Sequence, residues 1–412
     1  MPELIPFRNF HYKEGINDPK RLAELVAPPY DVISKDEKQE LKKKNPNNIC
    51  NIILPESYEK AGKLLDKMIK SDVLVCGESR CFCIYGIDYI KPDTGEKISR
   101  YGFVGLLKLV EIFPANDGVI PHEATFRKYT TDRLNLIQQT DANFSPLFMI
   151  YNGNGSADKV IQKYIKKDPF VETIDRDGFI HKVWEVLDIE DMKAIQEIVK
   201  KNFIIIADGH HRYVTSLRHS KHGGCKYIMT LFIDFNDPGL IIYTSHRQVH
   251  EISVNNTEEL INKVEPYFDV RSIDTYEKLK KLMENEKHVF GLYFHNKYFF
   301  LKFNENIPPE TIIEGNQSKE WKNLDIPILH QILLEKCLNV SKDKISFIKD
   351  VNKGISNVDD NNIKALFIVN PTKLEDVHKI THLGEIMPQK STYFYPKPLS
   401  GLIIHKHTDK IE

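Results

Sequence analysis

The sequence predicts an α+β fold in which mixed or antiparallel sheets pack against helices. Helical and strand-like patterns are interleaved along the chain, which is typical of domains whose helices cover a sheet. Some neighbouring strand patterns are joined by short turn sequences, at Pro92 to Gly95 and at Asn236 to Gly239. With 412 residues the chain is longer than one ordinary domain. We expect three subdomains, covering residues 1–115, 116–250 and 251–412.

Charge and composition exclude several classes of protein. The chain has 57 basic and 58 acidic residues, and this balance argues against a general nucleic-acid or anionic-membrane surface. No apolar run approaches the length of a bilayer-spanning helix. The first residues lack a signal-peptide pattern, and the six cysteines are typical of free thiols in a reducing compartment. We expect a cytoplasmic protein that acts on small molecules, with neither nucleic acid nor membrane as partner and with no indication of oligomeric state.

Secondary-structure patterns in the first half alternate between helix and strand. Ser34 stands where an N-cap is expected, ahead of a charged helix. Helices are expected at 35–44, 58–71, 158–167, 189–201 and 210–222, and strands at 81–89, 101–112, 145–151, 181–187 and 203–206.

The second half continues the same alternation. Strands are expected at 227–235, 240–244, 289–294, 298–303, 345–348 and 364–369, and helices at 258–267, 276–284, 324–337 and 372–379. The polar stretch 304–321 is broken by prolines and a glycine and is interpreted as a linker or loop.

The first candidate site begins where a buried strand pattern ends. Asp208 and Gly209 form a turn-favouring pair, and His210, His211 and Arg212 follow at the expected start of a helix. A helix N-terminus offers unpaired N–H groups and about half a positive charge, while imidazole and guanidinium add further donors. We therefore expect a phosphate group to bind here. Ligation of a metal by the histidine pair is disfavoured, because adjacent side chains on a strand point in divergent directions.

A second candidate cluster comprises His122, Glu123, Thr125, Arg127 and Arg133. A His-Glu pair followed closely by cations is dense in groups that can handle an anionic substrate. The alternative interpretation is a charged helix whose polar side chains face water.

Two later basic segments are weaker candidates. Arg247 stands at a strand end, where site residues concentrate, although an isolated basic residue there is more often incidental. Lys390, Ser391 and Thr392 supply one cation and two hydroxyl donors between prolines, which suits phosphate oxygens. An ordinary surface loop would have a similar composition.

Four separated motifs resemble, in order, those of one family long listed only as a domain of unknown function. They are Ala27 to Val32, His122-Glu123 with Thr125 and Asp132-Arg133, Asp208 to Arg212, and Met387-Pro388 with Lys390 to Thr392 and Ser400 to Leu402. Some members of that family are pyrophosphate-dependent L-serine kinases, and the Asp-Gly-His-His-Arg signature also resembles that of ParB-like free L-serine kinases. The resemblance implies a ParB-like nucleotide- or phosphate-binding core with additional subdomains.

The reaction that the resemblance implies is pyrophosphate plus L-serine giving O-phospho-L-serine and phosphate, an entry to cysteine synthesis. Phosphoryl transfer needs charge stabilisation, a metal that bridges phosphates and a group that orients or deprotonates the attacking hydroxyl. We expect Glu123 to be the general base, and Asp208 either to bind Mg²⁺ or to fix a neighbouring histidine.

The remaining candidate residues are expected to act in the same reaction. His210 and His211 complete the expected catalytic set, and they contact phosphate oxygens together with Gly209 and Arg212. Expected substrate or phosphate contacts come from His122, Thr125, Arg127, Arg133, Arg247 and Lys390 to Thr392. Two other functions use the same anion site, namely a phosphoester hydrolase with water as nucleophile and a non-catalytic sensor of phosphoserine or pyrophosphate.

Overall fold

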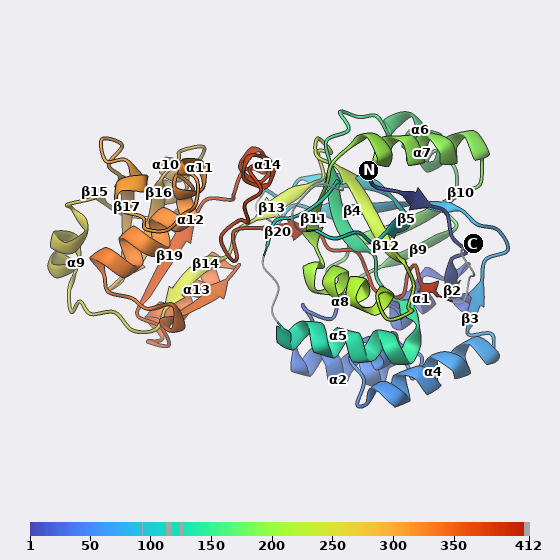
Figure 1. Ribbon diagram of the computed structural model, residues 1–412. Helices are drawn as coiled ribbons and strands as arrows, with labels where there is room; N and C mark the ends of the chain where they lie inside the picture. The colour runs from blue at the N-terminus through green and yellow to red at the C-terminus, as the bar shows by residue number, and fades with distance from the viewer. Residues whose placement is uncertain (93, 113–117, 124–126, 408–412) are drawn as a thin grey trace. The chain divides into compact units, whose positions relative to one another are not determined.

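The computed structural model describes residues 1–92, 94–112, 118–123 and 127–407, and its chain forms two compact units. The first unit joins Met1–Ile241 to Pro396–Glu412, and the second is Ile242–Tyr395 (Figure 1). The expected limit near residue 250 lies close to the start of the second unit. The expected limit near residue 115 falls between strands that belong to one sheet.

A large mixed sheet organises the first unit. Its strand order is β6-β11-β8-β12-β5-β4-β10-β9, with β1 paired to β5. β6 runs parallel to β11 and β8 runs parallel to β12, whereas the other pairs are antiparallel. The strands are β1 Leu4–Ile5, β4 Phe82–Ile90, β5 Lys97–Lys108, β6 Val119–Pro121, β8 Leu147–Tyr151, β9 Val171–Ile174, β10 Ile180–Val186, β11 Ile204–Asp208 and β12 Tyr227–Asp234.

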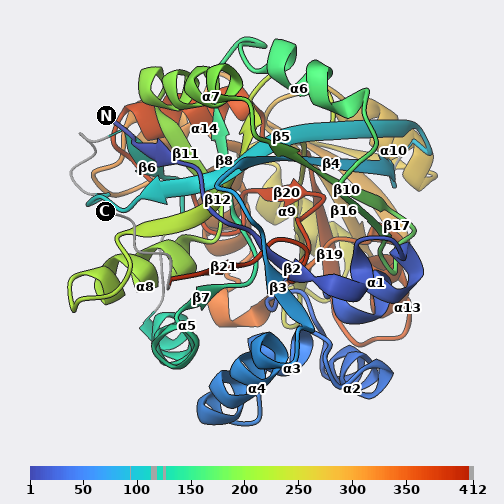
Figure 2. The same cartoon turned by 90° about the vertical axis from the view of Figure 1, so that its right-hand side faces the viewer.

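Helices cover both faces of this sheet (Figure 2). α6 and α7 lie on one face, and α5 and α8 lie on the other, where they also pack against each other. β8 is buried along its whole length, as expected for a central strand covered on both sides. The helices are α1 Pro19–Leu25, α2 Lys35–Lys44, α3 Cys50–Ile53, α4 Tyr58–Lys70, α5 Arg127–Thr140, α6 Asp158–Ile165, α7 Ile189–Lys201 and α8 His210–Ser220.

Short strands attach the ends of the chain to this unit. β2 (Phe10–Tyr12) pairs with β3 (Leu74–Cys76), and β7 (Ala142–Asn143) pairs with β21 (His405–Lys406). The expected cap at Ser34 is confirmed, because its hydroxyl and the Glu37 carboxylate form a reciprocal capping box at the start of α2.

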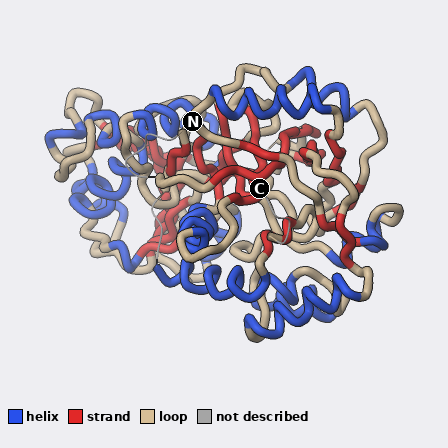
Figure 3. Tube along the Cα trace, turned by 45° about the vertical axis from the view of Figure 1, so that its right-hand side comes forward, coloured by secondary structure: helices blue, strands red, loops and turns tan. Residues whose placement is uncertain are grey.

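An antiparallel sheet organises the second unit, in the order β15-β17-β16-β19-β14-β18. Figure 3 shows its strands and flanking helices by colour. The strands are β14 His246–Val249, β15 Phe268–Ile273, β16 Val289–Phe294, β17 Lys297–Phe303, β18 Ile345–Ile348 and β19 Ala365–Val369. The helices are α9 Thr257–Val264, α10 Tyr276–Met283, α11 Lys319–Lys322, α12 Asp325–Pro327, a π-helix Ile328–Cys337, α13 Val351–Asp359 and α14 Leu374–His382.

The mixed and antiparallel sheets with packed helices confirm the expected fold class. Two local expectations differ from the structure. β13 (Ile241–Tyr243) pairs with β20 (Tyr393–Tyr395) and not with β12, so the turn at Asn236 to Gly239 does not close a hairpin. The expected linker at 304–321 lies inside the second unit and includes α11. Among the described residues, no helix is both long and apolar enough to cross a membrane.

Candidate functional site

The candidate site is built on the turn between β11 and α8. Gly209 connects them with a φ of +98°, in the left-handed region that favours glycine. A Cβ atom at this position would lie 2.6 Å from Cδ2 of Leu147 and 2.9 Å from a guanidinium nitrogen of Arg212. The glycine therefore lets the strand turn sharply into the helix while Arg212 folds back against the turn.

Asp208, at the end of β11, is held between two cations. Its Oδ1 lies 2.6 Å from Nζ of Lys397, and its Oδ2 accepts a hydrogen bond of 3.2 Å from Arg212. Nζ of Lys397 also lies 2.5 Å from Oδ2 of Asp31. The Lys397 side chain is only 8% exposed, so its charge is balanced inside the protein by two carboxylates.

The charges of this cluster stabilise one another. Burial would raise the pKa of Asp208, but Lys397 and Arg212 outweigh that effect and hold the pKa below its ordinary value. Burial would lower the pKa of Lys397, but Asp208 and Asp31 raise it well above the ordinary value. Both shifts favour the ionised pair around neutral pH.

Lys397 is a site residue that the sequence analysis missed. It stands between Pro396 and Pro398, and the segment that follows is fixed by backbone contacts. The Leu399 N–H donates 3.0 Å to the hydroxyl of Tyr85, and Ser400 forms an antiparallel bridge with Ala27. A lysine enclosed by two prolines is the local signal that could have indicated a rigidly presented cation.

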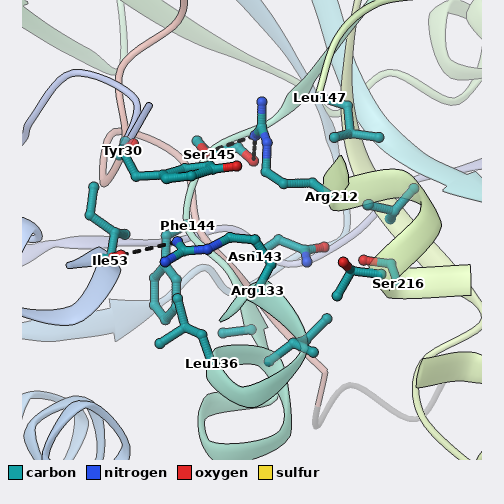
Figure 4. Close-up of a pocket in the computed structure, with 15 residues that line it drawn as sticks. Tyr30, Ile53, Arg133, Leu136, Asn143, Phe144, Ser145, Leu147, Arg212 and Ser216 are labelled. Atoms are coloured by element: carbon teal, nitrogen blue, oxygen red, sulfur yellow. Dashed lines mark hydrogen bonds between the residues drawn. The ribbon is translucent and has the colours of Figure 1, made fainter. Parts of the chain in front are cut away.

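A pocket of about 60 Å³ opens beside this cluster, lined by residues from several distant segments (Figure 4). Arg133 from α5 and Arg212 from α8 both line it, together with Tyr30, Ser145 and Ser400. The volume holds a few water-sized groups, so the pocket admits a small ligand or one end of a larger one.

The two arginines are fixed by protein acceptors. One terminal nitrogen of Arg212 donates to the Ser145 carbonyl at 3.1 Å, to its hydroxyl at 2.9 Å and to the Pro146 carbonyl at 3.0 Å. Arg133 pairs with Asp132 and donates 3.0 Å to the Ile53 carbonyl.

Tyr30 packs against Arg133 within the pocket. Its ring lies 4.1 Å from the guanidinium carbon of Arg133, within the range of a cation–π contact. Burial raises the pKa of the Tyr30 hydroxyl, although the nearby positive charges of Arg212 and Arg133 oppose the shift. The segment Ala27 to Val32 therefore contributes directly to the site, and Tyr30 and Asp31 are further residues to which the sequence analysis gave no role.

His122 and His210 form a buried pair next to the turn. The His122 backbone N–H donates 3.2 Å to Nε2 of His210, and the two ring centroids are 4.7 Å apart. An accepting Nε2 carries no proton, so His210 is the neutral tautomer protonated on Nδ1. Burial and the neighbouring His122 and His211 hold the pKa of His210 well below its ordinary value.

This geometry gives His210 a positioning contact, and the phosphate contact expected from sequence stays a prediction. The acceptor nitrogen fixes the backbone just after β6, one residue before the partly buried Glu123. Nδ1 of His122 also contacts the Ile206 carbonyl. Burial lowers the pKa of His122, although Glu123 and Asp208 nearby oppose that shift. His211 follows on the first turn of α8 and is partly buried.

The structure places the other expected residues in different surroundings. Thr125 lies outside the described residues, and Arg127 begins α5 but only its backbone is described. Arg247 belongs to the second unit, where it is fully buried on β14 and donates 3.1 Å to Nε2 of His330. Burial lowers the pKa of Arg247 to about 9.

The segment Lys390 to Thr392 also belongs to the second unit. Ser391 is buried, its hydroxyl donates to the Pro388 carbonyl, and its own carbonyl accepts a 2.7 Å hydrogen bond from Thr372. Lys390 is exposed. A role for this segment in closing over phosphates stays a prediction.

Asp208 does not have the surroundings of a metal ligand. Each of its carboxylate oxygens faces a cation, and a divalent ion would have to displace Lys397 or Arg212 from a compact, charge-balanced cluster. Of the two roles expected for Asp208, the geometry favours the fixing of neighbouring side chains, which are Lys397 and Arg212 in place of a histidine.

Sequence comparison places the chain in a family. A family model described as a protein of unknown function, DUF1015, matches residues 4–327, so the chain belongs to that family. The match includes the Asp208 to Arg212 turn. No curated protein matches the sequence.

Solved structures give distant likenesses. The chain is 15% identical to a conserved hypothetical protein from Pyrococcus furiosus, with a TM-score of 0.33 and coverage of 68% of this chain and 90% of that one. It is 15% identical to a free serine kinase in complex with AMP, with a TM-score of 0.34 and coverage of 69% and 88%. It is 10% identical to C-terminally truncated SbnI from Staphylococcus aureus, with a TM-score of 0.34 and coverage of 73% and 86%.

Replacing Asp208 with asparagine should destabilise the first unit. The substitution removes one of two carboxylates that balance Lys397, and breaking a buried ion pair costs roughly 3–5 kcal/mol. Because the pKa of Asp208 is lowered, its contribution is present above its unfolded pKa of about 3.9 and is lost as pH falls through the folded value. In urea unfolding at pH 7, the free energy of unfolding should therefore be much lower for Asp208→Asn than for the wild type. The difference between the two proteins should decrease towards pH 3.

The matched control is Asp31→Asn, because Asp31 contacts the same lysine but its side chain is 38% exposed. The loss should be smaller there, since water replaces part of the interaction. Equal losses at the two positions would contradict a special role for Asp208.

Replacing His210 with glutamine should make stability less dependent on pH. A histidine with a lowered folded pKa favours folding above its unfolded pKa of about 6.5 and loses that contribution as pH falls. Between pH 6.5 and 5, the free energy of unfolding should therefore fall less steeply in the variant, by up to about 1.4 kcal/mol per pH unit. His222→Gln is the control, because His222 is exposed. If the free energy of unfolding varied with pH equally in the wild type and in His210→Gln, the lowered pKa of His210 would be refuted.

Proposed function

We propose that this protein is a phosphotransferase that makes O-phospho-L-serine from L-serine and pyrophosphate. The observation that carries the proposal is a pocket lined by Arg133 and Arg212, in which Arg212 also donates a hydrogen bond to Asp208 of the Asp208–Lys397 pair. In the reaction, the serine hydroxyl oxygen forms a bond to one phosphorus while the bridging P–O bond breaks. Phosphate leaves, and the hydroxyl proton passes to a base.

The fixed cations supply the electrostatic part of this chemistry. Arg212 and Arg133 are held by acceptors that do not depend on a ligand, so little reorganisation is needed when phosphate charge develops nearby. Planar guanidinium groups bind phosphate and carboxylate oxygens well, so they could bind either pyrophosphate or the carboxylate of serine.

Glu123 is the proposed base. It follows His122, whose backbone N–H donates to the neutral ring of His210 just after β6. A correctly placed base contributes on the order of 10²–10⁴ in rate. Mg²⁺ enters this proposal as a companion of pyrophosphate, where it would neutralise phosphate charge, and Asp208 is not its ligand.

The first test is direct formation of phosphoserine. Purified protein is incubated with Mg²⁺ and L-serine, and in parallel with pyrophosphate, ADP or ATP, and the products are followed by ³¹P NMR. We expect phosphoserine and an equal amount of phosphate with pyrophosphate. Phosphate release that does not require serine would indicate a hydrolase, and binding without turnover would indicate a sensor.

The second test distinguishes the role of Glu123 as base from the role of Arg212 in binding the phosphoryl donor. Glu123→Gln should lower kcat by about 10²-fold or more while leaving KM for pyrophosphate nearly unchanged. Arg212→Lys keeps a positive charge but cannot satisfy the acceptors at Ser145 and Pro146, so KM for the donor should rise and kcat should fall. Wild-type kinetics in Glu123→Gln would remove Glu123 from the mechanism, and wild-type kinetics in Arg212→Lys would remove the phosphate role of this pocket.

A further inference from the structure

A second cluster of chemically competent side chains lies at the opposite end of α8. It is formed by Asp141, His219 and His407, whose potential ligand atoms all lie within 4.8 Å of one another. His219 is nine positions beyond His210 on the same helix, which corresponds to about 13 Å along the helix axis. The cluster is therefore separate from the candidate phosphate site.

The three residues come from segments that lie far apart in the sequence. Asp141 follows α5 with a φ of +43°, and its carbonyl accepts a 2.8 Å hydrogen bond from the His407 backbone N–H. His407 directly follows β21, which is paired to β7 just after Asp141. The ring of His219 is confined by Gly224, where a Cβ atom would come within 2.1 Å of the imidazole.

The unusual feature of this cluster is that some of its imidazole nitrogens are buried without a hydrogen bond to the described part of the chain. Within the described residues, Nε2 of His219 and both ring nitrogens of His407 are buried and make no hydrogen bond. The two side chains are 12% and 5% exposed, respectively. Buried polar groups normally have hydrogen-bond partners, so three such ring nitrogens next to one carboxylate indicate a place where a ligand can bind.

We propose that Asp141, His219 and His407 bind one divalent transition-metal ion of the Zn²⁺ class. Two neutral imidazoles and one carboxylate are ligands that zinc accepts, with a water molecule completing four-coordination. A tetrahedral zinc site with bonds of about 2.0–2.1 Å places its ligand atoms about 3.3 Å apart. Oδ1 of Asp141 lies 3.5 Å from Nε2 of His219 and 3.9 Å from Nδ1 of His407, so small shifts close the site.

The negative charge of the cluster comes from its carboxylate. The carboxylate of Asp141 is 55% exposed and supplies the negative charge at the solvent side of the site.

The bound metal would join the C-terminal segment to the core of the first unit. β21 is only two residues long, and its pairing with the equally short β7 provides few hydrogen bonds. A metal shared by His407, His219 and Asp141 would connect this segment to α8 and to the end of α5. We assign the site a structural role, and it does not depend on the proposed kinase reaction.

The test measures metal content and thermal stability in the full chain, purified without a histidine tag. Protein is stripped with chelator, loaded with Zn²⁺, desalted and analysed by elemental mass spectrometry. We expect about one zinc ion per chain in the wild type and a zinc-dependent rise in Tm. Both should be lost in His407→Ala and His219→Ala and strongly reduced in Asp141→Asn.

His222→Ala is the matched control, because His222 lies just beyond α8 but is exposed and outside the cluster. It should bind zinc as the wild type does. Cobalt substitution adds a readout, since a four-coordinate site gives visible absorption that the His407→Ala variant should lack, and circular dichroism confirms that each variant is folded. Absence of retained zinc in the wild type, or equal zinc content in wild type and the folded His407→Ala variant, would overturn the proposal.

Discussion

The ion pair between Asp208 and Lys397 is the interaction on which the candidate site depends. It joins the end of β11 to a segment almost two hundred positions later, and Asp31 attaches the N-terminal motif to the same lysine. Neither charge could be buried alone, because an isolated ion loses far more hydration energy than ordinary packing returns. The three segments are therefore stable in this arrangement only together, and the arginine-lined pocket forms next to them.

Buried His210 has a different role from the charged residues. Its neutral ring accepts a backbone hydrogen bond. A protonated ring there would add a positive charge where burial disfavours it. The first histidine of the motif thus supplies a directional hydrogen bond, whereas arginine and lysine carry the permanent charges.

Local features of the fold could be predicted from the sequence, because they depend on residues close together in the chain. Ser34 and Glu37 fit a capping box, and the turn at Gly209 follows from a glycine between a strand and a helix pattern. Lys397 could not be paired with Asp208 in this way, since periodicity does not reveal which distant segments meet. The same limit applies to His219 and His407, which are unremarkable in sequence and become neighbours only through the pairing of β7 with β21.

The role of individual side chains was harder to predict than their membership of the site. Arg212 and Arg133 do line one pocket, but the expected lysine at position 390 belongs to the other unit, and Lys397 provides the cation next to Asp208. Composition could not distinguish these two lysines, because both stand in proline-rich segments. Burial distinguishes them, since Lys390 is exposed and the side chain of Lys397 is 8% exposed.

The order of the chain has a consequence for biosynthesis. Because the second unit is inserted between Ile241 and Pro396, the ribosome completes that unit before it makes the segment that carries Lys397. Domains generally begin to fold during synthesis, so the first unit waits with Asp208 lacking its lysine until the segment after Pro396 emerges. A chain terminated before Pro396 would therefore contain the whole Asp-Gly-His-His-Arg motif but not the cation that balances it, so the candidate site cannot form from the first part of the unit alone.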